Sequence, residues 1–368
     1  MKINITNPYR EIEQLNNVNL KIEKVLKSGS YIGGNYLNEF ESSLQNFLKI
    51  KYVTTVNSGT DALTLSLLSM GISKGDEILV PSFTFFATVE SILLVGATPV
   101  FVDIDLNNYC LDLNDLCSKI TKKTKVIIPV HLFGNNSQIE KIVNIAKSYK
   151  ILVLEDSAQS FGSMDSNQNY LGTIGDIGAF SFYPSKTLGG IGDGGLVATN
   201  NKKYYNSVQL LKNHGQSKNY LHKTVGMNSR LDTVNAAVLN EKLKIFDKIK
   251  KSRNELFTFY CDNLSSAEWI SLPKKDNPNI LFNYFTIFVS PKIRTNLINY
   301  LNENGIGNSI YYKRPIHLQP VINQLSNKRV QLKNTEIASK SVLSLPYFPF
   351  AKKIEMEYIV SKLLNFKT

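Results

Sequence analysis

Cysteine is scarce in this chain, and long apolar runs are absent. Cys110, Cys117 and Cys261 are its only cysteines, with no CxxC pair and no Cys/His cluster. Such a set supports neither a disulfide framework nor a zinc site, so we expect reduced, structural thiols and no metal. No run approaches the roughly eighteen apolar residues of a membrane span, and the N-terminus lacks the apolar core of a signal peptide. We therefore expect a cytoplasmic protein with no membrane partner.

A nucleic-acid-binding motif is also missing, although the formal net charge is +12. The lysines are scattered along the chain. Those within residues 241–251 alternate with apolar residues in a helical pattern, which is typical of the solvated face of an amphipathic helix. No nucleic-acid partner is expected, but the diffuse positive field favours a substrate that carries a diphosphate.

The sequence contains neither of two glycine motifs that bind nucleotide phosphates in a form that predicts such a site. A Gly-x-Gly-x-x-Gly pattern runs through Gly190, Gly192 and Gly195, but the strand-like run Leu196–Thr199 follows where a dinucleotide site requires a helix. No Walker sequence GxxxxGK[ST] occurs. We therefore exclude both phosphate-binding motifs.

Short apolar runs alternate with helix-length patterns through the first two thirds of the chain. This alternation, with nearly continuous apolar strands, predicts an α/β fold with a large, mostly parallel sheet covered on both faces. Helical patterns of this part include residues 62–70 and 88–95, and another lies at residues 8–30 and ends at a glycine turn. The predicted strands are 53–56, 78–80, 99–102, 126–130, 151–154, 179–182 and 196–199.

The last third of the chain has a different character. Long helical patterns run from residue 232 to about 262, and residues 280–289 follow as an apolar strand-like run. Helical patterns return at 292–304 and 354–364. We predict a smaller α+β C-terminal domain of residues 251–368 beside a large domain of residues 1–250.

Residues 150–195 set an acid and a lysine beside two predicted strands. The first strand ends at Asp156, and the second leads through a turn to Lys186. Strand C-termini in an open parallel sheet share one edge, so both side chains are expected to face one cavity. Taken separately, Asp156 is better explained as a helix N-cap and Lys186 as a solvated loop residue.

Together the two residues suit pyridoxal phosphate. This cofactor needs a lysine amine for its aldehyde and a carboxylate that keeps its ring nitrogen protonated. An ordinary lysine with a pKa of ~10.4 is free amine in only about one molecule in 2500 at pH 7. Burial or positive neighbours must therefore lower the pKa of Lys186.

Several segments resemble those of one enzyme family in order and spacing. Residues 155–159 read Glu-Asp-Ser-Ala-Gln, and residues 181–189 read Ser-Phe-Tyr-Pro-Ser-Lys-Thr-Leu-Gly. They are similar to the pyridoxal-phosphate motif of the DegT/DnrJ/EryC1/StrS nucleotide-sugar aminotransferases. The resemblance implies a fold-type-I pyridoxal-phosphate transferase that works as a homodimer. In this family Lys186 and Asp156 are the catalytic pair.

The same resemblance assigns the residues around the cofactor. Asn228, in a Gly-x-Asn-x-Arg segment, reaches the phosphate of the neighbouring subunit, so the active sites are shared. Phe85 stacks on the ring, and Gln159 lies near its phenolic oxygen. The cofactor residues implied are Ser58, Gly59, Thr60, Phe85, Asp156, Gln159, Ser181, Lys186 and Asn228.

The substrate residues implied are Tyr31, Tyr183, Lys313 and His317, whereas His131 is expected to be structural. Residues 311–314 read Tyr-Tyr-Lys-Arg where many relatives carry His-Tyr-Pro. Lys313 or Arg314 is a candidate for the nucleotide diphosphate. Two solvated loop cations explain the same pattern.

The expected reaction moves an amino group from L-glutamate to a nucleotide-linked keto sugar for surface-glycan biosynthesis. Residues 56–63 and 128–134 look more like the branch that acts at C3 of dTDP-3-keto-6-deoxyhexoses. A C4 enzyme on a UDP-, GDP- or dTDP-4-keto sugar is the alternative, and a non-catalytic regulator of the same fold is a second. Dehydratases of the family replace the lysine by histidine, so Lys186 argues against them.

Overall fold

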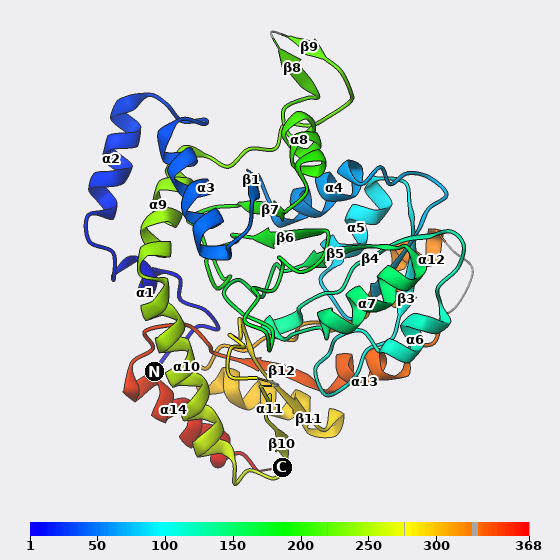
Figure 1. The fold of residues 1–368 in the computed structure, drawn as a ribbon. Helices are drawn as coiled ribbons and strands as arrows, with labels where there is room; N and C mark the ends of the chain where they lie inside the picture. Colours follow the sequence, from blue (N-terminus) through cyan, green and yellow to red (C-terminus); the bar gives the residue numbers. More distant parts are fainter. Residues whose placement is uncertain (219, 276, 326–329, 368) are drawn as a thin grey trace.

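The chain is built around a seven-stranded sheet in the order β1-β7-β6-β5-β4-β2-β3 (Figure 1). The computed structural model describes residues 1–218, 220–275, 277–325 and 330–367. Strand β7 is antiparallel to both of its neighbours, and the other pairings are parallel. The strands are β1 (Tyr52–Val56), β2 (Glu77–Pro81), β3 (Thr98–Val102), β4 (Thr124–Ile127), β5 (Leu152–Asp156), β6 (Ile177–Ser181) and β7 (Gly195–Thr199).

All seven predicted strands are confirmed, with ends shifted by a few residues. Their near-continuous apolar sequence suits a sheet whose two faces are both covered. One face carries α4 (Gly59–Ser69), α5 (Phe86–Leu94) and α8 (Lys202–Leu211), and the helices α3 (Asn35–Leu48) and α7 (Ile139–Tyr149) belong to two other buried clusters. Helix α4 is buried on nearly all sides because it packs on the sheet and on α5 and α8.

The helix predicted over residues 8–30 is two helices, α1 (Tyr9–Ile12) and α2 (Val18–Ser28). The chain breaks between them because Asn17 adopts a left-handed conformation with φ 65°. The apolar spacing continues across this break, so periodicity alone did not locate it. Helix α2 ends at Gly29, which also adopts a left-handed conformation. The glycine turn in the sequence predicted a helix end at this place.

The C-terminal part forms an antiparallel sheet in the order β10-β11-β12 with helices around it (Figure 1). The strand predicted over residues 280–289 begins only at Phe285, and residues 280–284 run on as a loop. The predicted domain boundary at residue 250 falls inside helix α10. The elements are α9 (Thr233–Lys244), α10 (Phe246–Leu264), β10 (Ile270–Ser271), β11 (Phe285–Val289), α11 (Pro291–Glu303), α12 (Pro320–Leu325), α13 (Lys333–Ser341), β12 (Val342–Leu345) and α14 (Lys353–Leu364).

A short hairpin of β8 (Gln216–Lys218) and β9 (Leu221–His222) projects from the body of the molecule (Figure 1). Tyr220 at its tip is 86% exposed, and Val225 just after it is 90% exposed. Apolar side chains this exposed on a projecting hairpin are typical of a surface that contacts another molecule. The remaining elements are α6 (Leu113–Ser118) and the short 3₁₀ turns Leu132–Gly134 and Ile316–Leu318.

The described residues contain no helix that is both long and apolar enough to cross a bilayer. None of the three cysteines forms a disulfide within the described residues. Within the same residues no group of three or more His, Cys, Asp or Glu side chains is arranged to hold a metal ion.

Candidate active site

Strand β5 carries Asp156 to the carboxyl edge of the sheet, where the side chain is buried. Thr88 Oγ1 donates to Asp156 Oδ2 at 2.8 Å, and the Ala158 amide donates to Oδ1 at 3.2 Å. Burial raises the pKa of Asp156, while these hydrogen bonds and the charge of Lys186 lower it. A cationic donor at this carboxylate would therefore favour its ionised form.

Lys186 lies in the turn that follows the adjacent strand β6. Its amide donates to the Tyr183 carbonyl at 2.9 Å. The turn closes tightly, because a Cβ added to Gly189 would lie 2.3 Å from the Pro184 carbonyl oxygen. The sheet and this turn together place Lys186 within range of the charge of Asp156.

Burial lowers the pKa of Lys186 to about 8, and the charge of Asp156 opposes that shift. At pH 7 about one Lys186 in ten is then a free amine, compared with about one in 2500 for an ordinary lysine. The fold itself therefore prepares this side chain as a nucleophile.

The N-terminus of α4 forms a cradle beside these two residues. Ser58 caps the helix by accepting the Asp61 amide at 3.1 Å, and the amides of Gly59 and Thr60 lie in the first turn, which has no intrahelical acceptor. A Cβ added to Gly59 would lie 2.9 Å from Cβ of Ser181, at the end of β6. Backbone amides and hydroxyls thus converge on one place that suits a phosphate.

Gly195, the first residue of β7, makes this close approach possible. A Cβ at this position would lie 2.2 Å from the Ser58 carbonyl oxygen and 2.9 Å from the Gly59 nitrogen. Any side chain here would push the start of α4 away from β7. The glycine that looked like part of a dinucleotide motif instead supports the cradle, and a strand follows it, as predicted.

Aromatic side chains form a wall next to the carboxylate. Phe85 is 59% exposed at the start of α5, whereas Phe83 is fully buried, so Phe85 is the ring that is free to stack. The Phe85 and Tyr312 ring centroids are 6.1 Å apart. Gln159 donates from Nε2 to the Tyr312 hydroxyl at 3.0 Å, and its Oε1 accepts the Phe133 amide at 2.8 Å. Gln159 and Phe85 therefore meet at Tyr312.

The other predicted site residues are distributed differently. Tyr31 is half exposed and lies beside the start of α9, where its backbone carbonyl accepts a hydrogen bond from the Thr233 amide at 2.9 Å. The remaining exposed side chains are Tyr183, Asn228 and Lys313. In this single chain, the contacts of the described residues do not join Tyr31, Asn228 or Lys313 to the Asp156 cluster.

His317 is not exposed to the site. Its side chain is buried, and its Nδ1 accepts a hydrogen bond from the Ser82 hydroxyl at 2.7 Å. The His317 amide donates to the same hydroxyl oxygen at 3.0 Å. The imidazole therefore fastens its segment to Ser82, three residues before Phe85. His131 is also buried and donates from Nε2 to Glu155 at 2.8 Å, which agrees with the expected structural role.

Sequence reasoning missed two residues that complete the cluster. Thr88 had a weak signal, because it lies one helical turn after Phe85 in the same motif. Tyr312 had none, because its approach to Gln159 joins segments 153 residues apart. Burial raises the pKa of Tyr312 well above its ordinary value, so the hydroxyl stays neutral and can donate toward the site.

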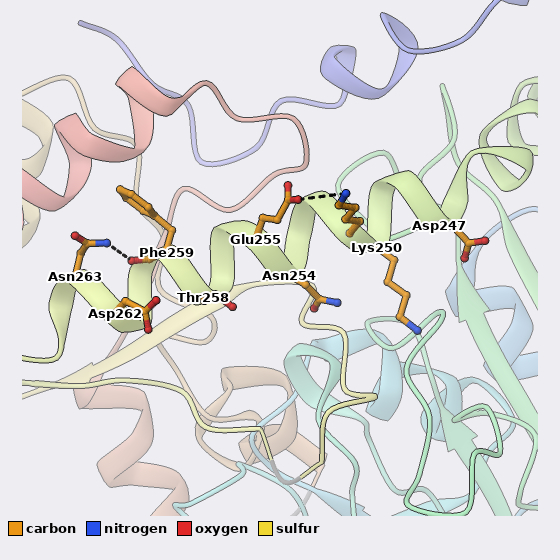
Figure 2. A pocket seen from close by; sticks show the side chains of 9 residues that line it. Asp247, Lys250, Asn254, Glu255, Thr258, Phe259, Asp262 and Asn263 are labelled. Atoms are coloured by element: carbon orange, nitrogen blue, oxygen red, sulfur yellow. Dashed lines mark hydrogen bonds and ion pairs between the residues drawn. The ribbon is translucent and has the colours of Figure 1, made fainter.

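An open groove along the outer face of α10 is unrelated to this cluster. Figure 2 shows its polar side chains spread along the helix, and none of the predicted site residues lines it. Asn263 donates to the Phe259 carbonyl of the same helix at 2.8 Å, and the lysines and acids alternate. We interpret it as a solvated helix face.

The cluster offers a partner to each polar group of pyridoxal phosphate. The cradle of Ser58, Gly59 and Thr60 suits the phosphate, and Lys186 supplies the amine. Asp156 accepts two hydrogen bonds from the residues that the structure describes, and it can accept the ring N–H as a third. Phe85 is free to cover the ring from one side.

Comparison with known proteins agrees with this fit. The DegT/DnrJ/EryC1/StrS aminotransferase family matches residues 13–364. The pleiotropic regulatory protein of Geobacillus stearothermophilus is 37% identical, and the match covers 94% of this chain and 93% of that protein. The UDP-2-acetamido-2-deoxy-3-oxo-D-glucuronate aminotransferase of Pseudomonas aeruginosa is 35% identical, covering 94% of each chain. The dTDP-3-amino-3,6-dideoxy-alpha-D-galactopyranose transaminase of Aneurinibacillus thermoaerophilus is also 35% identical, covering 96% and 97%.

Solved structures give the same picture. DesV of S. venezuelae, in complex with a ketimine intermediate, superposes with a TM-score of 0.93 at 32% identity and covers 98% of this chain and 97% of its own. An aminotransferase-fold protein of Bacillus subtilis, Ntda with bound cofactor PMP, superposes with a TM-score of 0.90 at 31% identity and covers 99% and 84%. The first structure contains a reaction intermediate, and the second contains the cofactor PMP.

Proposed function

This chain belongs to the DegT/DnrJ/EryC1/StrS aminotransferase family, and from that premise we propose that it aminates C3 of a nucleotide-linked 3-keto sugar. It is a pyridoxal-phosphate-dependent transaminase. The observation that carries the proposal is the Asp156–Lys186 pair beside a phosphate cradle. We propose L-glutamate as donor, a dTDP-3-keto-6-deoxyhexose as acceptor and surface-glycan synthesis as the use of the product.

The cofactor supplies an electron sink that stabilises negative charge at the donor carbon. Lys186 would hold the cofactor through its Nζ, and the same amine, when free, would take up a proton from the donor Cα. Asp156 holds the proton on the ring nitrogen. Gly59 and Thr60 bind the phosphate, and Gln159 orients the ring edge. The keto sugar accepts nitrogen by the same proton transfers in reverse.

The preference for C3 rests on relatives. Two of the similar proteins carry names that specify a 3-oxo or a 3-amino sugar, one linked to UDP and the other to dTDP. The choice of dTDP follows the sequence likeness of residues 56–63 and 128–134. Exposed Lys313 and Arg314 are proposed to bind the diphosphate, since both lie just after Tyr312 of the site.

The test supplies the enzyme with L-glutamate and either a dTDP-3-keto-6-deoxyhexose or the 4-keto isomer, and NMR spectroscopy identifies the aminated carbon. We expect the 3-amino sugar only. A 4-amino product would replace the proposal by the C4 alternative. The Lys186→Ala variant should lose turnover, whereas a regulator without catalysis would keep its partner binding in that variant.

We also propose a homodimer with shared active sites. Several half-exposed apolar residues support it, namely Tyr31, Ile32, Phe85, Tyr183 and Ile191. The projecting hairpin β8–β9 adds Tyr220, Leu221 and Val225. Asn228 follows this hairpin with an exposed amide, so it is available to the phosphate cradle of a second copy.

A further inference from the structure

A buried ionic cluster lies outside the residues described so far. Glu11 of α1, Lys242 of α9 and Arg253 of α10 are 2%, 1% and 3% exposed. Lys242 Nζ forms an ion pair with Glu11 Oε2, and Arg253 Nη2 lies 3.9 Å from Glu11 Oε1. Burying such charges is costly, and apolar residues of similar volume often stabilise a core equally well. The position of the cluster therefore calls for an explanation other than stability.

Lys242 connects this cluster to the turn that carries the catalytic lysine. Its Nζ donates to the Gly189 carbonyl at 2.5 Å, three residues after Lys186. Gly189 is itself buried and lies against Pro184, on the other side of Lys186. The Lys242 ammonium therefore holds the end of the turn that lies at Gly189.

Arg253 reaches the same turn through Asn283. Arg253 Nη1 donates to the Asn283 carbonyl at 3.4 Å, and Thr187 Oγ1 donates to Asn283 Oδ1 at 3.1 Å. The backbone N–H of Asn283 donates to the Phe133 carbonyl at 2.7 Å. Thr187, the residue next to Lys186, is therefore held to the same buried group as Gly189.

These contacts form a closed chain from Thr187 through Asn283, Arg253, Glu11 and Lys242 back to Gly189. We propose that Glu11, Lys242 and Arg253 are positioning residues that fix the Lys186 turn so that Nζ meets the cofactor carbonyl beside Asp156. The carboxylate of Glu11 holds the two cations, and the cations hold the turn. Reaction geometry is sensitive to displacements of about 1 Å, so a loosened turn slows attack by Lys186.

The test measures how fast Lys186 captures the cofactor. Apoprotein of the full chain is mixed with pyridoxal phosphate, the adduct is trapped with borohydride, and mass spectrometry quantifies modified Lys186 over time. The Glu11→Gln/Lys242→Met double variant removes both charges of one ion pair, so no carboxylate is left buried without its lysine. We expect trapping about tenfold slower than in the unaltered protein.

The matched control is Glu241→Gln/Lys244→Met, which removes an ion pair of 2.7 Å between partly buried Glu241 and exposed Lys244 of the same helix. It should trap at the unaltered rate. Urea unfolding of every variant separates stability from positioning. A double variant that unfolds at a lower urea concentration but traps cofactor normally would contradict the proposal and assign the cluster to stability alone.

The Thr187→Val variant provides a second test, which does not depend on whether the double variant folds. It removes only the hydrogen bond to Asn283 and leaves the charges in place. We expect trapping about threefold slower, with an unchanged urea midpoint, because one attachment of the turn to the buried cluster is lost. An unaltered trapping rate in Thr187→Val would contradict the proposal independently.

Discussion

At the scale of single residues, the site depends on how Asp156 and Lys186 affect each other. Asp156 is buried and Lys186 is partly buried, and burial alone favours the neutral form of both. Each charge partly offsets that effect on its neighbour. The result is a carboxylate whose ionised form is favoured by Lys186, and a lysine whose pKa is lowered to about 8 by burial although the charge of Asp156 raises it.

The pH dependence of Lys186 reactivity follows from its lowered pKa. In apoprotein, borohydride trapping of pyridoxal phosphate at Lys186 should rise about tenfold per pH unit below pH 8 and level off above it. Deprotonation frees the amine, so the rate increases with pH. A half-maximal rate near pH 10 would contradict this account.

The Asp156→Asn variant separates the two roles of the carboxylate. Because Asp156 raises the pKa of Lys186, its removal should move the trapping profile to lower pH. Transaminase turnover should nevertheless fall about 10³-fold, because the ring nitrogen loses the group that keeps it charged. A trapping profile displaced to higher pH would show that the assumed interaction is wrong.

The sequence predicted these two residues because each follows an apolar strand within a recognisable motif. It could not predict Tyr312, whose contact with Gln159 depends on how the C-terminal segment returns to the sheet. The cluster of Glu11, Lys242 and Arg253 was hidden for the same reason. In sequence its members look like ordinary charges of amphipathic helices.

At the scale of elements, the phosphate cradle depends on how closely β7 approaches the start of α4. The seven strands were predictable from apolar runs, but the approach of two backbones depends on a missing side chain. Gly195 is where that approach occurs. Element ends were harder to predict, since the break at Asn17 and the loop at residues 280–284 both lie within apolar patterns.

Replacing Gly195 by alanine should therefore weaken cofactor binding. The new Cβ would lie 2.2 Å from the Ser58 carbonyl, so the start of α4 must move and the phosphate donors move with it. We expect affinity for pyridoxal phosphate, measured by fluorescence titration of apoprotein, to fall at least about tenfold, roughly the loss of one charge-assisted hydrogen bond.

Gly192→Ala is the matched control for this substitution. It lies in the same glycine-rich loop, but a Cβ there would have no neighbour within 4 Å. Its cofactor affinity should be unchanged. Equal affinities for the Gly195→Ala and Gly192→Ala variants would show that the cradle does not need the close approach.

At the scale of the whole molecule, the single chain leaves several large apolar side chains exposed. Phe85, Tyr183 and Ile191 are each about half exposed, and the hairpin β8–β9 projects from the body of the molecule (Figure 1). A second copy would cover such a surface. The predicted boundary at residue 250 remains a prediction, because α10 runs through it and one buried cluster includes residues of both parts.

Mixing two inactive variants tests whether sites are shared. Lys186→Ala and Asn228→Ala subunits are combined under conditions that exchange chains, and transaminase activity is measured. If Asn228 serves the neighbouring site, half of the dimers are mixed and each regains one complete site, so activity should return to about a quarter. No recovery, with exchange verified by native mass spectrometry, would mean that each chain completes its own site.

We propose that this transaminase carries pyridoxal phosphate on Lys186. The most direct test is the visible absorption spectrum of the purified protein reconstituted with that cofactor, recorded before and after addition of L-glutamate. We predict a yellow protein whose band bleaches as the amino group moves to the cofactor, and no such bound band in Lys186→Ala. A protein that stays colourless after reconstitution would contradict the central claim.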